Sequence, residues 1–575
     1  MIQILKSKMI KVSKQFFLLV ALAASISFTT SAQSDSSLEL SDSAKITAPN
    51  NWYQLDRAET GYYGISLDKA YDFLKTRKSN TVVVAVIDSG VDTTHEDLKS
   101  ILWNNPGEIP GNGIDDDHNG YIDDVYGWNF IGGKDGRNVH QDSYEAARIS
   151  WKLKPGYDDN VADTTKMNPA QKAEYATYLK AKDNVVGAVN PAEFLMMQRI
   201  LPVLQRGDSI IAHDLGKIEF NGNDLKTYNP VVADAKTATA IYLNISKLNN
   251  SYDITNQQIL DDLKGQLRKG EAATTPPEDF RGEIVKDNPN DINDRYYGNN
   301  DVMAGTPSHG THCSGIIAAV RNNDKGMNGI ADNVRIMMIR AVPDGDEHDK
   351  DIANAIRYAV DNGAKVISMS FGKSFSPEKN WVDDAVKYAQ SKDVLMVHAA
   401  GNDAKNVDTA DNFPNPVFRD QSGRAKNFIT VGASGDSTNG GFTASFSNYG
   451  KNEVDVFSPG VNIYSTLPGG NKYGNFSGTS MAAPVVAGLG ALILEYFPDL
   501  SAEQIKYVIE KSVAPATEKV KKPGTTDMVN LSDISKSGGE VNAYNAVKLA
   551  ATLKGERNTR AEKLPKSKVK NRKRA

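Results

Sequence analysis

Cysteine is nearly absent from this chain of 575 residues, which contains a single one, Cys313. One cysteine excludes a disulfide within the chain and a zinc site made of several thiolates. An excess of one charge is also lacking, because the formal net charge is -5 at pH 7. This balance favours neither a nucleic-acid partner nor a strong attraction to a membrane surface. The function therefore has to be read from local motifs.

Long apolar runs are scarce as well. The run near the start, from Phe16 to about Phe28, follows four lysines and precedes small residues. It is too short to span a bilayer comfortably, so it predicts a signal peptide over residues 1–32, cleaved after Ala32, rather than a stable membrane anchor. Met9 is an alternative start. We therefore expect an exported protein, located outside the cell or in the periplasm.

Short apolar runs rich in valine and isoleucine recur along the chain, the first of them at residues 81–88 (TVVVAVID). Such runs are typical of strands that are buried on both faces of a parallel sheet. Amphipathic helical patterns, for example residues 348–363, separate several of them. The alternation predicts an α/β fold, namely a doubly wound, mostly parallel sheet flanked by helices.

A largely helical insertion interrupts this alternation of strands and helices. Asn168 and Asn190, each followed by proline, are typical caps of helices within it. The last residues are rich in lysine and arginine and nearly free of apolar side chains, which predicts a disordered basic tail. The expected division is a signal peptide (1–32), an N-terminal segment (33–79), the first part of the α/β domain (80–140), the insertion (141–289), the second part (290–550) and the tail (551–575).

Three motifs place chemically useful side chains at the ends of these elements. Asp88 closes the first buried run, at the sheet edge where open α/β folds bind ligands. His309 begins a predicted helix in SHGTHCSG, and Ser480 begins another in GTSMAAP. Each residue alone is compatible with a structural role. The three together, in the order Asp, His, Ser and each on a glycine-flanked strand end or helix start, are much more specific.

The segments VIDSGVDTTHEDL (86–98), HGTHCSG (309–315) and GTSMAAP (478–484) resemble the signatures of the subtilisin-like serine proteases, the subtilase family. The resemblance covers about residues 80–130 and 295–500. It implies a subtilisin-like catalytic domain that hydrolyses peptide bonds in peptide or protein substrates and needs no cofactor for catalysis. The implied nucleophile is Ser480, with His309 as general base and Asp88 as its orienting carboxylate.

The resemblance extends to the groups around the reacting bond. HAAGND (398–403) is similar to the oxyanion segment, which implies Asn402 and the backbone N–H of Ser480 as donors. The small side chains of the implied pocket leave room for a large apolar residue before the scissile bond, although Asn412 and Phe413 in the facing loop leave that open. The implied substrate-binding residues are Ser370, Phe371, Gly372, Ala399, Ala400 and Gly401.

An acidic stretch, GIDDDHNGYIDD (113–124), has the D-x-D-x-N-G pattern of calcium loops. It lacks a glutamate at the twelfth place, so an acidic surface turn is the alternative. The family resemblance implies a second structural calcium site near the loop 321–329. The predicted calcium ligands are Asp115, Asp117, Asn119 and Asp123 or Asp124 in the first site, and Asp97, Asn322 and Asn323 in the second.

Two features depart from the family pattern. Asp88 and His309 are more than two hundred positions apart, and the insertion accounts for most of this separation. The insertion either covers the substrate groove and controls the enzyme, or it is structural decoration. Only about fifty residues lie between the signal peptide and the first core strand, too few for a long inhibitory propeptide. A transpeptidase and a catalytically silent binding protein on the same fold remain alternative functions.

The neighbours of His309 raise one more question, because His312 and Cys313 could join it in a metal site. Zinc needs three or four convergent ligands, and the sequence supplies no second cluster of cysteine and histidine. We therefore expect His312 to be a packed helix residue and Cys313 to be a small buried residue behind the base.

Overall fold

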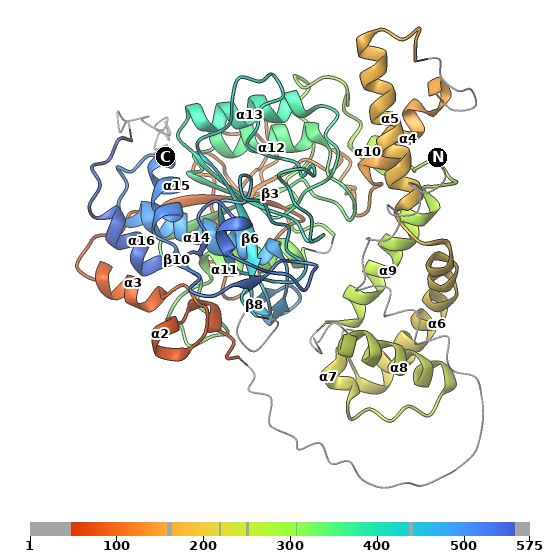
Figure 1. Ribbon diagram of the computed structural model, residues 1–575, viewed down its shortest axis with the longest axis horizontal. Helices are drawn as coiled ribbons and strands as arrows, with labels where there is room; N and C mark the ends of the chain where they lie inside the picture. Colours follow the sequence, from red (N-terminus) through yellow and green to blue (C-terminus); the bar gives the residue numbers. More distant parts are fainter. Residues whose placement is uncertain are drawn as a thin grey trace, which may run out of the picture. The chain divides into compact units, whose positions relative to one another are not determined.

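The computed structural model describes residues 48–157, 164–217, 220–248, 252, 254–305, 307–435 and 441–557. The predicted signal peptide and nearly all of the predicted basic tail lie outside these residues. The described chain divides into two compact units (Figure 1). Residues 146–277 form the helical unit, and residues 48–145 together with 278–557 form the sheet unit.

A nine-stranded sheet is the centre of the sheet unit, with the strand order β10-β13-β7-β6-β5-β4-β1-β3-β2. Neighbouring strands are parallel except for β10 and β13 at one edge. This arrangement is the predicted doubly wound, mostly parallel α/β sheet. Its strands are β1 (Val82–Asp88), β2 (Gly127–Asn129), β3 (Val334–Arg340), β4 (Val366–Met369), β5 (Leu395–Ala399), β6 (Phe428–Ser434), β7 (Val456–Pro459), β10 (Ala514–Pro515) and β13 (Gly539–Glu540).

Helices cover both faces of this sheet (Figure 1). In β1, Val84 and Val86 pack with helices α11 (Ser308–Ala318) and α14 (Thr479–Tyr496). The alternating side chains Ala85 and Ile87 pack with α12 (Asp349–Asp361) and α13 (Lys379–Ser391) on the other face. Burial on both faces explains why the strand sequences are continuous apolar runs instead of alternating ones.

Helix α14 lies in the middle of the larger core, and 89% of the stretch Thr479–Tyr496 is buried inside the protein. Among the described residues it is the one helix long and apolar enough to cross a membrane. Shorter elements surround the sheet. They are η2 (Trp52–Gln54), α2 (Arg57–Thr60), α3 (Leu67–Leu74), α10 (Phe280–Val285), β8 (Ile463–Leu467), β9 (Lys472–Phe476), α15 (Ala502–Lys511), β11 (Val520–Lys521), β12 (Met528–Val529), η3 (Leu531–Asp533) and α16 (Ala543–Ala550).

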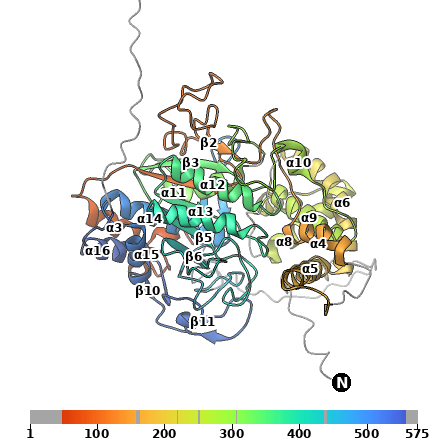
Figure 2. The same cartoon turned by 90° about the horizontal axis from the view of Figure 1, so that it is seen from above.

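The helical unit has a core of its own, in which α6 lies beside α8 and α9 (Figure 2). Asn168 and Asn190 cap its helices as their sequences suggest, since each side chain accepts a backbone N–H from the first turn. The helices are α4 (Glu145–Tyr157), α5 (Pro169–Gly187), α6 (Pro191–Leu215), α7 (Gly222–Leu225), α8 (Ala233–Leu248) and α9 (Asn256–Glu271).

The boundaries of this unit lie inside the predicted insertion of residues 141–289, because both flanking segments belong to the sheet unit. Glu145 forms a buried ion pair with Lys373, which also pairs with Asp349 of α12. On the other side, Arg281 pairs with Asp351, two residues further along the same helix. Both flanks are thereby fastened to the first turn of α12.

Candidate active site

Asp88 and His309 meet because a strand end and a helix start approach each other closely. Asp88 is the last residue of β1, and His309 lies in the first turn of α11. A Cβ atom at Gly310 would lie 2.1 Å from the carbonyl oxygen of Gly90. Glycine is therefore required at this position for the helix to come so near the strand end.

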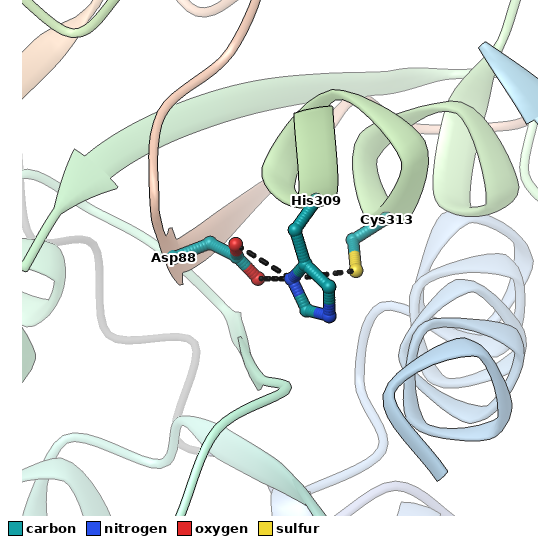
Figure 3. A group of neighbouring side chains, drawn as sticks. All are labelled: Asp88, His309 and Cys313. Atoms are coloured by element: carbon teal, nitrogen blue, oxygen red, sulfur yellow. Dashed lines mark hydrogen bonds and ion pairs between the residues drawn. The ribbon is translucent and has the colours of Figure 1, made fainter. Parts of the chain in front are cut away.

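The two side chains form an ion pair in which the imidazole is oriented by the carboxylate (Figure 3). The Nδ1 atom of His309 lies 2.8 Å from Oδ1 and 3.0 Å from Oδ2 of Asp88. Asp88 is only 2% exposed, whereas the His309 side chain is 37% exposed. Burial lowers the pKa of His309, but the Asp88 carboxylate outweighs it and holds this pKa well above the ordinary value.

Ser480 lies next to this pair at the start of α14, but its hydroxyl points elsewhere. Its Oγ donates to the carbonyl oxygen of Ser370 at 3.1 Å, and the Ser370 hydroxyl donates to the carbonyl oxygen of Ser480 at 2.9 Å. Among the described residues, this hydroxyl makes no hydrogen bond to His309. Cys313 connects the groups, because its Sγ lies 3.4 Å from the carbonyl oxygen of Ser480 and 3.9 Å from Nδ1 of His309.

A metal ion is the other chemistry that Asp88, His309 and Cys313 could support, since their ligand atoms lie within 4.8 Å of one another. Metals bind the thiolate form of cysteine, however, and burial raises the pKa of the Cys313 thiol. The ring of His312 is buried against Phe476 with its Nε2 atom 3.1 Å from the carbonyl oxygen of Gly474, away from this cluster. The three residues therefore fit an acid–base site better than a metal site.

Two hydrogen-bond donors border a common space beside Ser480. The Oδ1 atom of Asn402 accepts hydrogen bonds from the backbone N and the hydroxyl of Thr479, both at 2.9 Å, which fixes the amide group. A Cβ atom built on Gly478 would lie 3.4 Å from Nδ2 of Asn402 and 3.6 Å from the backbone N of Ser480. The Nδ2 atom of Asn402 and the backbone N of Ser480 therefore lie near one another at the start of α14.

The implied substrate segments lie on either side of Asn412. Its Nδ2 atom donates to the carbonyl oxygens of Ala399 and Ala400, at 3.3 Å and 2.9 Å. On the opposite side, a Cβ atom at Gly372 would lie 2.7 Å from Oδ1 of Asn412. His398, the first residue of HAAGND, lies in the same region. Its Nε2 atom is 2.7 Å from the carbonyl oxygen of Phe371, and burial lowers its pKa to about 4.

Comparison with known proteins decides the family. A model of the subtilase family matches residues 79–536. The chain belongs to the subtilase family. The predicted family and fold class are thus confirmed.

Two curated relatives are similar to this subtilase in part. The thermophilic serine proteinase of Bacillus sp. (strain AK1) is 37% identical over 270 residues, which make up 47% of this chain and 58% of that protein. Thermitase of Thermoactinomyces vulgaris is 39% identical over 240 residues, or 42% of this chain and 74% of thermitase. The chain therefore spans little more than half the length of the first of these relatives.

A solved structure of a protease from Pseudoalteromonas arctica is similar over 87% of this chain and 97% of that chain. The TM-score is 0.43 and the sequence identity is 21%.

One predicted calcium site of this subtilase is assembled only in part. Both carboxylate oxygens of Asp97 are in use, since Oδ1 accepts from Nδ2 of Asn323 at 2.5 Å and Oδ2 from the hydroxyl of Tyr473 at 2.7 Å. Asn322 is exposed, and its backbone N donates to Asn328 instead. The structure thus brings Asp97 and Asn323 together and leaves Asn322 outside. Tyr473 is distant in sequence and was not foreseen.

In the predicted calcium loop at 113–124, the carboxylates that lie together are not the set that the D-x-D-x-N-G pattern predicts. The carboxylate of Asp115 accepts the backbone N–H groups of Asn119 and Gly120. The carboxylate of Asp123 accepts the backbone N–H groups of Gly111, Asn112 and Gly113. Both aspartates therefore stabilise turns. The carboxylates that converge are instead those of Glu108, Asp117 and Asp124.

Proposed function

We propose that this subtilase is an exported serine endopeptidase that hydrolyses peptide or protein substrates through an acyl-enzyme intermediate. The observation that carries the proposal is the ion pair between the buried Asp88 and the partly exposed His309, beside the helix start that presents Ser480. The serine-proteinase names of the relatives support the same reaction. The predicted signal peptide, which lies outside the described residues, supports export.

The reaction begins when the Oγ atom of Ser480 attacks the carbonyl carbon of the scissile bond. Rotation about the Cα–Cβ bond turns the hydroxyl from Ser370 toward Nε2 of His309, which accepts its proton. Asp88 holds the imidazole in the correct tautomer and stabilises the imidazolium. The oxyanion is stabilised by Nδ2 of Asn402 and the backbone N–H of Ser480. His309 then returns the proton to the leaving amine, and water is activated in the same way to hydrolyse the acyl-enzyme.

The pocket geometry favours a small residue before the scissile bond. The amide of Asn412 bridges the two walls, from Gly372 on one side to Ala399 and Ala400 on the other. A large apolar side chain between these walls would displace the amide and break both of its hydrogen bonds. We therefore propose a preference for small residues at this position. The small side chains of the pocket walls by themselves would suggest a large apolar residue.

Calcium is proposed as a structural ion that takes no part in catalysis. The proposed ligands are Asp97 and Asn323, and calcium there would replace the hydrogen bonds that the Asp97 carboxylate accepts from Nδ2 of Asn323 and from the hydroxyl of Tyr473. A cation there would offset a fully buried carboxylate and fasten the loop 321–329 to the segment that contains Asp97.

A serine-directed fluorophosphonate probe tests the proposed function on the full chain. We expect one covalent label on Ser480, identified by mass spectrometry of the digested protein, and none in Ser480→Ala. The matched control is Ser477→Ala, which removes an exposed hydroxyl three residues away and should still be labelled. An unlabelled parent protein would indicate a silent binding protein instead. Peptide products joined to an added amine, rather than to water, would indicate the transpeptidase.

A further inference from the structure

Arg340 is a buried cation beside Asp88 at the edge of the sheet. It is the last residue of β3, and its partner in the parallel register with β1 is Asp88 itself. Val86 and Met338, two residues earlier on each strand, both pack in the core that includes α11. Because side chains alternate along a strand, Arg340 lies on the same face of the sheet as Asp88. Only 2% of Arg340 is exposed.

No carboxylate of the described residues forms an ion pair with this guanidinium. Burial lowers the pKa of Arg340 to about 10, against the attraction of the exposed Asp301. Another buried cation of the sheet unit, Arg281, is paired with Asp351 at 2.7 Å. A buried cation without such a partner is unfavourable unless other groups of the protein hold it. The role of Arg340 is therefore not to neutralise a buried acid.

The guanidinium donates to uncharged oxygens of separate segments. Its Nε–H group is shared by the carbonyl oxygens of Ser89 and Ala304, both at 3.1 Å. Its Nη1 atom donates to Oδ1 of Asn129 at 3.1 Å, and its Nη2 atom donates to the carbonyl oxygen of Val139. A planar fork with donors in fixed directions holds several segments at once, which a single ammonium group cannot do.

The shared Nε–H group joins the two halves of the proposed acid–base pair. Ser89 follows Asp88 directly, and Ala304 lies five positions before His309. These two carbonyl groups are more than two hundred positions apart in the sequence, with the helical unit between them. Arg340 therefore ties the residue after the carboxylate to the segment that precedes the base.

The same segments pack too closely to accept larger side chains. A Cβ atom at Gly90 would lie 2.9 Å from the carbonyl oxygen of Val302 and 3.5 Å from that of Ala304. A Cβ atom at Gly305 would lie 3.1 Å from Nη2 of Arg340. Close packing on both sides of the guanidinium leaves these segments little room to shift.

We propose that Arg340 is a positioning residue that keeps Asp88 and His309 at hydrogen-bond distance by holding the segments next to them. Among the described residues, its guanidinium makes no hydrogen bond to either side chain, so it acts through the backbone. This role rests on the proposed protease function, in which Asp88 orients the general base. A displacement of about 1 Å in such a site lowers turnover by about 100-fold.

An NMR titration of His309 tests this arrangement whether or not the protein is a protease. The sample is the full chain with ¹³C-labelled histidine and with Ser480→Ala to prevent self-digestion, and the His309 signal is assigned by its loss in His309→Gln. We expect Arg340→Met, which keeps a long side chain but removes every donor, to lower the pKa of His309 by about 0.5 or more, toward its ordinary value of 6.5.

The direction of this change separates positioning from a direct effect of charge. Removal of a nearby cation would by itself raise the pKa of His309, whereas a looser contact with Asp88 lowers it. The matched control is Arg335→Met on the same strand. Arg335 is partly exposed and donates to the carbonyl oxygen of its neighbour Val334, so this variant should keep the parent value.

Activity gives the second measurement, made on the chain with Ser480 intact. Arg340→Met should lower kcat for a peptide substrate by about tenfold or more and leave KM within about threefold, because the substrate segments are not among those that Arg340 holds. Arg340→Lys keeps the charge but cannot reach all four oxygens, so it should show smaller losses of kcat and of the pKa of His309.

The proposal is wrong if a folded Arg340→Met variant keeps either the pKa of His309 or the kcat of the parent, or if Arg335→Met changes both as much. Should Arg340→Met not fold, parent values of both quantities in Arg340→Lys would overturn it. An inactive parent in which Arg340→Met still lowers the pKa of His309 would contradict the protease function and support the arrangement of the three residues.

Discussion

At His309, burial and a carboxylate act in opposite directions on one imidazole. Burial favours the neutral ring, whereas Asp88 at 2.8 Å favours the charged ring and prevails, so the pKa of His309 is raised. The folded state therefore gains stability from this pair below the ordinary pKa, and loses that gain as the pH rises through the raised pKa. The general base needs the neutral ring, so activity should follow the opposite course.

The raised pKa of His309 predicts an alkaline rise in the rate of the enzyme. We expect kcat/KM for a peptide substrate to increase with pH through a midpoint above 6.5, the ordinary pKa of histidine. In Asp88→Asn the midpoint should move to lower pH, and the rate should fall by about 10⁴ because the imidazole loses its orienting partner. The measurement is the pH dependence of kcat/KM for both proteins.

Two other buried histidines cannot produce this rise, since burial lowers the pKa of His312 to about 3 and that of His398 to about 4. An unchanged midpoint in Asp88→Asn would mean that another group controls the rate.

Single residues of the site could be named from sequence only where a motif has fixed spacing. Asp88, His309, Ser480 and Asn402 each lie in a short glycine-flanked motif, and the fold brings them to one place. Glu108 lies outside the D-x-D-x-N-G pattern and joins the carboxylate cluster only because the chain reverses at 109–113. The hydrogen bond of Ser480 to Ser370 depends on a rotamer, which no sequence pattern encodes.

At the scale of elements, the loop that contains Asn412 is fixed against the segment after β4. Lys373 and Phe413 exchange both of their backbone hydrogen bonds, at 2.9 Å and 3.1 Å. The side chain of Asn415 donates to the carbonyl oxygen of Asn412. The amide of Asn412 is thus held between the two pocket walls by contacts on several sides, and a substrate side chain would have to compete with them.

Replacing this amide should change the preferred substrate. In Asn412→Gly we expect the ratio of kcat/KM for phenylalanine over alanine before the scissile bond to rise by about tenfold or more. Matched p-nitroanilide peptides that differ only in this residue give the measurement. Asn406→Gly, the same change at a position earlier in the chain, should keep the ratio of the parent. A parent that already prefers phenylalanine would contradict the proposed pocket while leaving the protease function intact.

Elements were foreseen best where one pattern ran for a whole strand or helix. The buried runs of β1, β3 and β6 and the capped helices α5 and α6 follow directly from their sequences. Strands β10 and β13 have two residues each, too few to show a period. The predicted insertion of residues 141–289 includes Glu145 and Arg281, which are buried in ion pairs within the sheet unit, a burial that single charged residues in a sequence do not reveal.

At the scale of the molecule, each unit buries its own apolar side chains. The core of the helical unit consists of residues from that unit alone, and the two large clusters of the sheet unit contain none of them. All of the proposed catalytic groups belong to the sheet unit. This separation bears on the two roles considered for the insertion, because a unit with a separate core can be removed without opening a cavity in the other.

Deletion of residues 146–277 distinguishes the two roles. Of the remaining ends, Glu145 pairs with Lys373, and Glu278 lies three residues before Arg281 in the chain. Lys373 and Arg281 pair in turn with Asp349 and Asp351 in the first turn of α12. A Gly/Ser linker of about ten residues, with a mean span of roughly 17 Å, should therefore join them. We expect the shortened chain to fold cooperatively, as followed by circular dichroism, and to hydrolyse a short peptide within about tenfold of the parent rate.

The same deletion carrying Ser480→Ala is the matched control and should be inactive. A shortened chain that does not fold would mean that the insertion assists folding despite its separate core. A folded chain that cleaves short peptides normally but protein substrates much faster than the parent would assign the insertion to covering the groove. Equal rates on both kinds of substrate would leave it a structural addition, as the independence of the two cores leads us to expect.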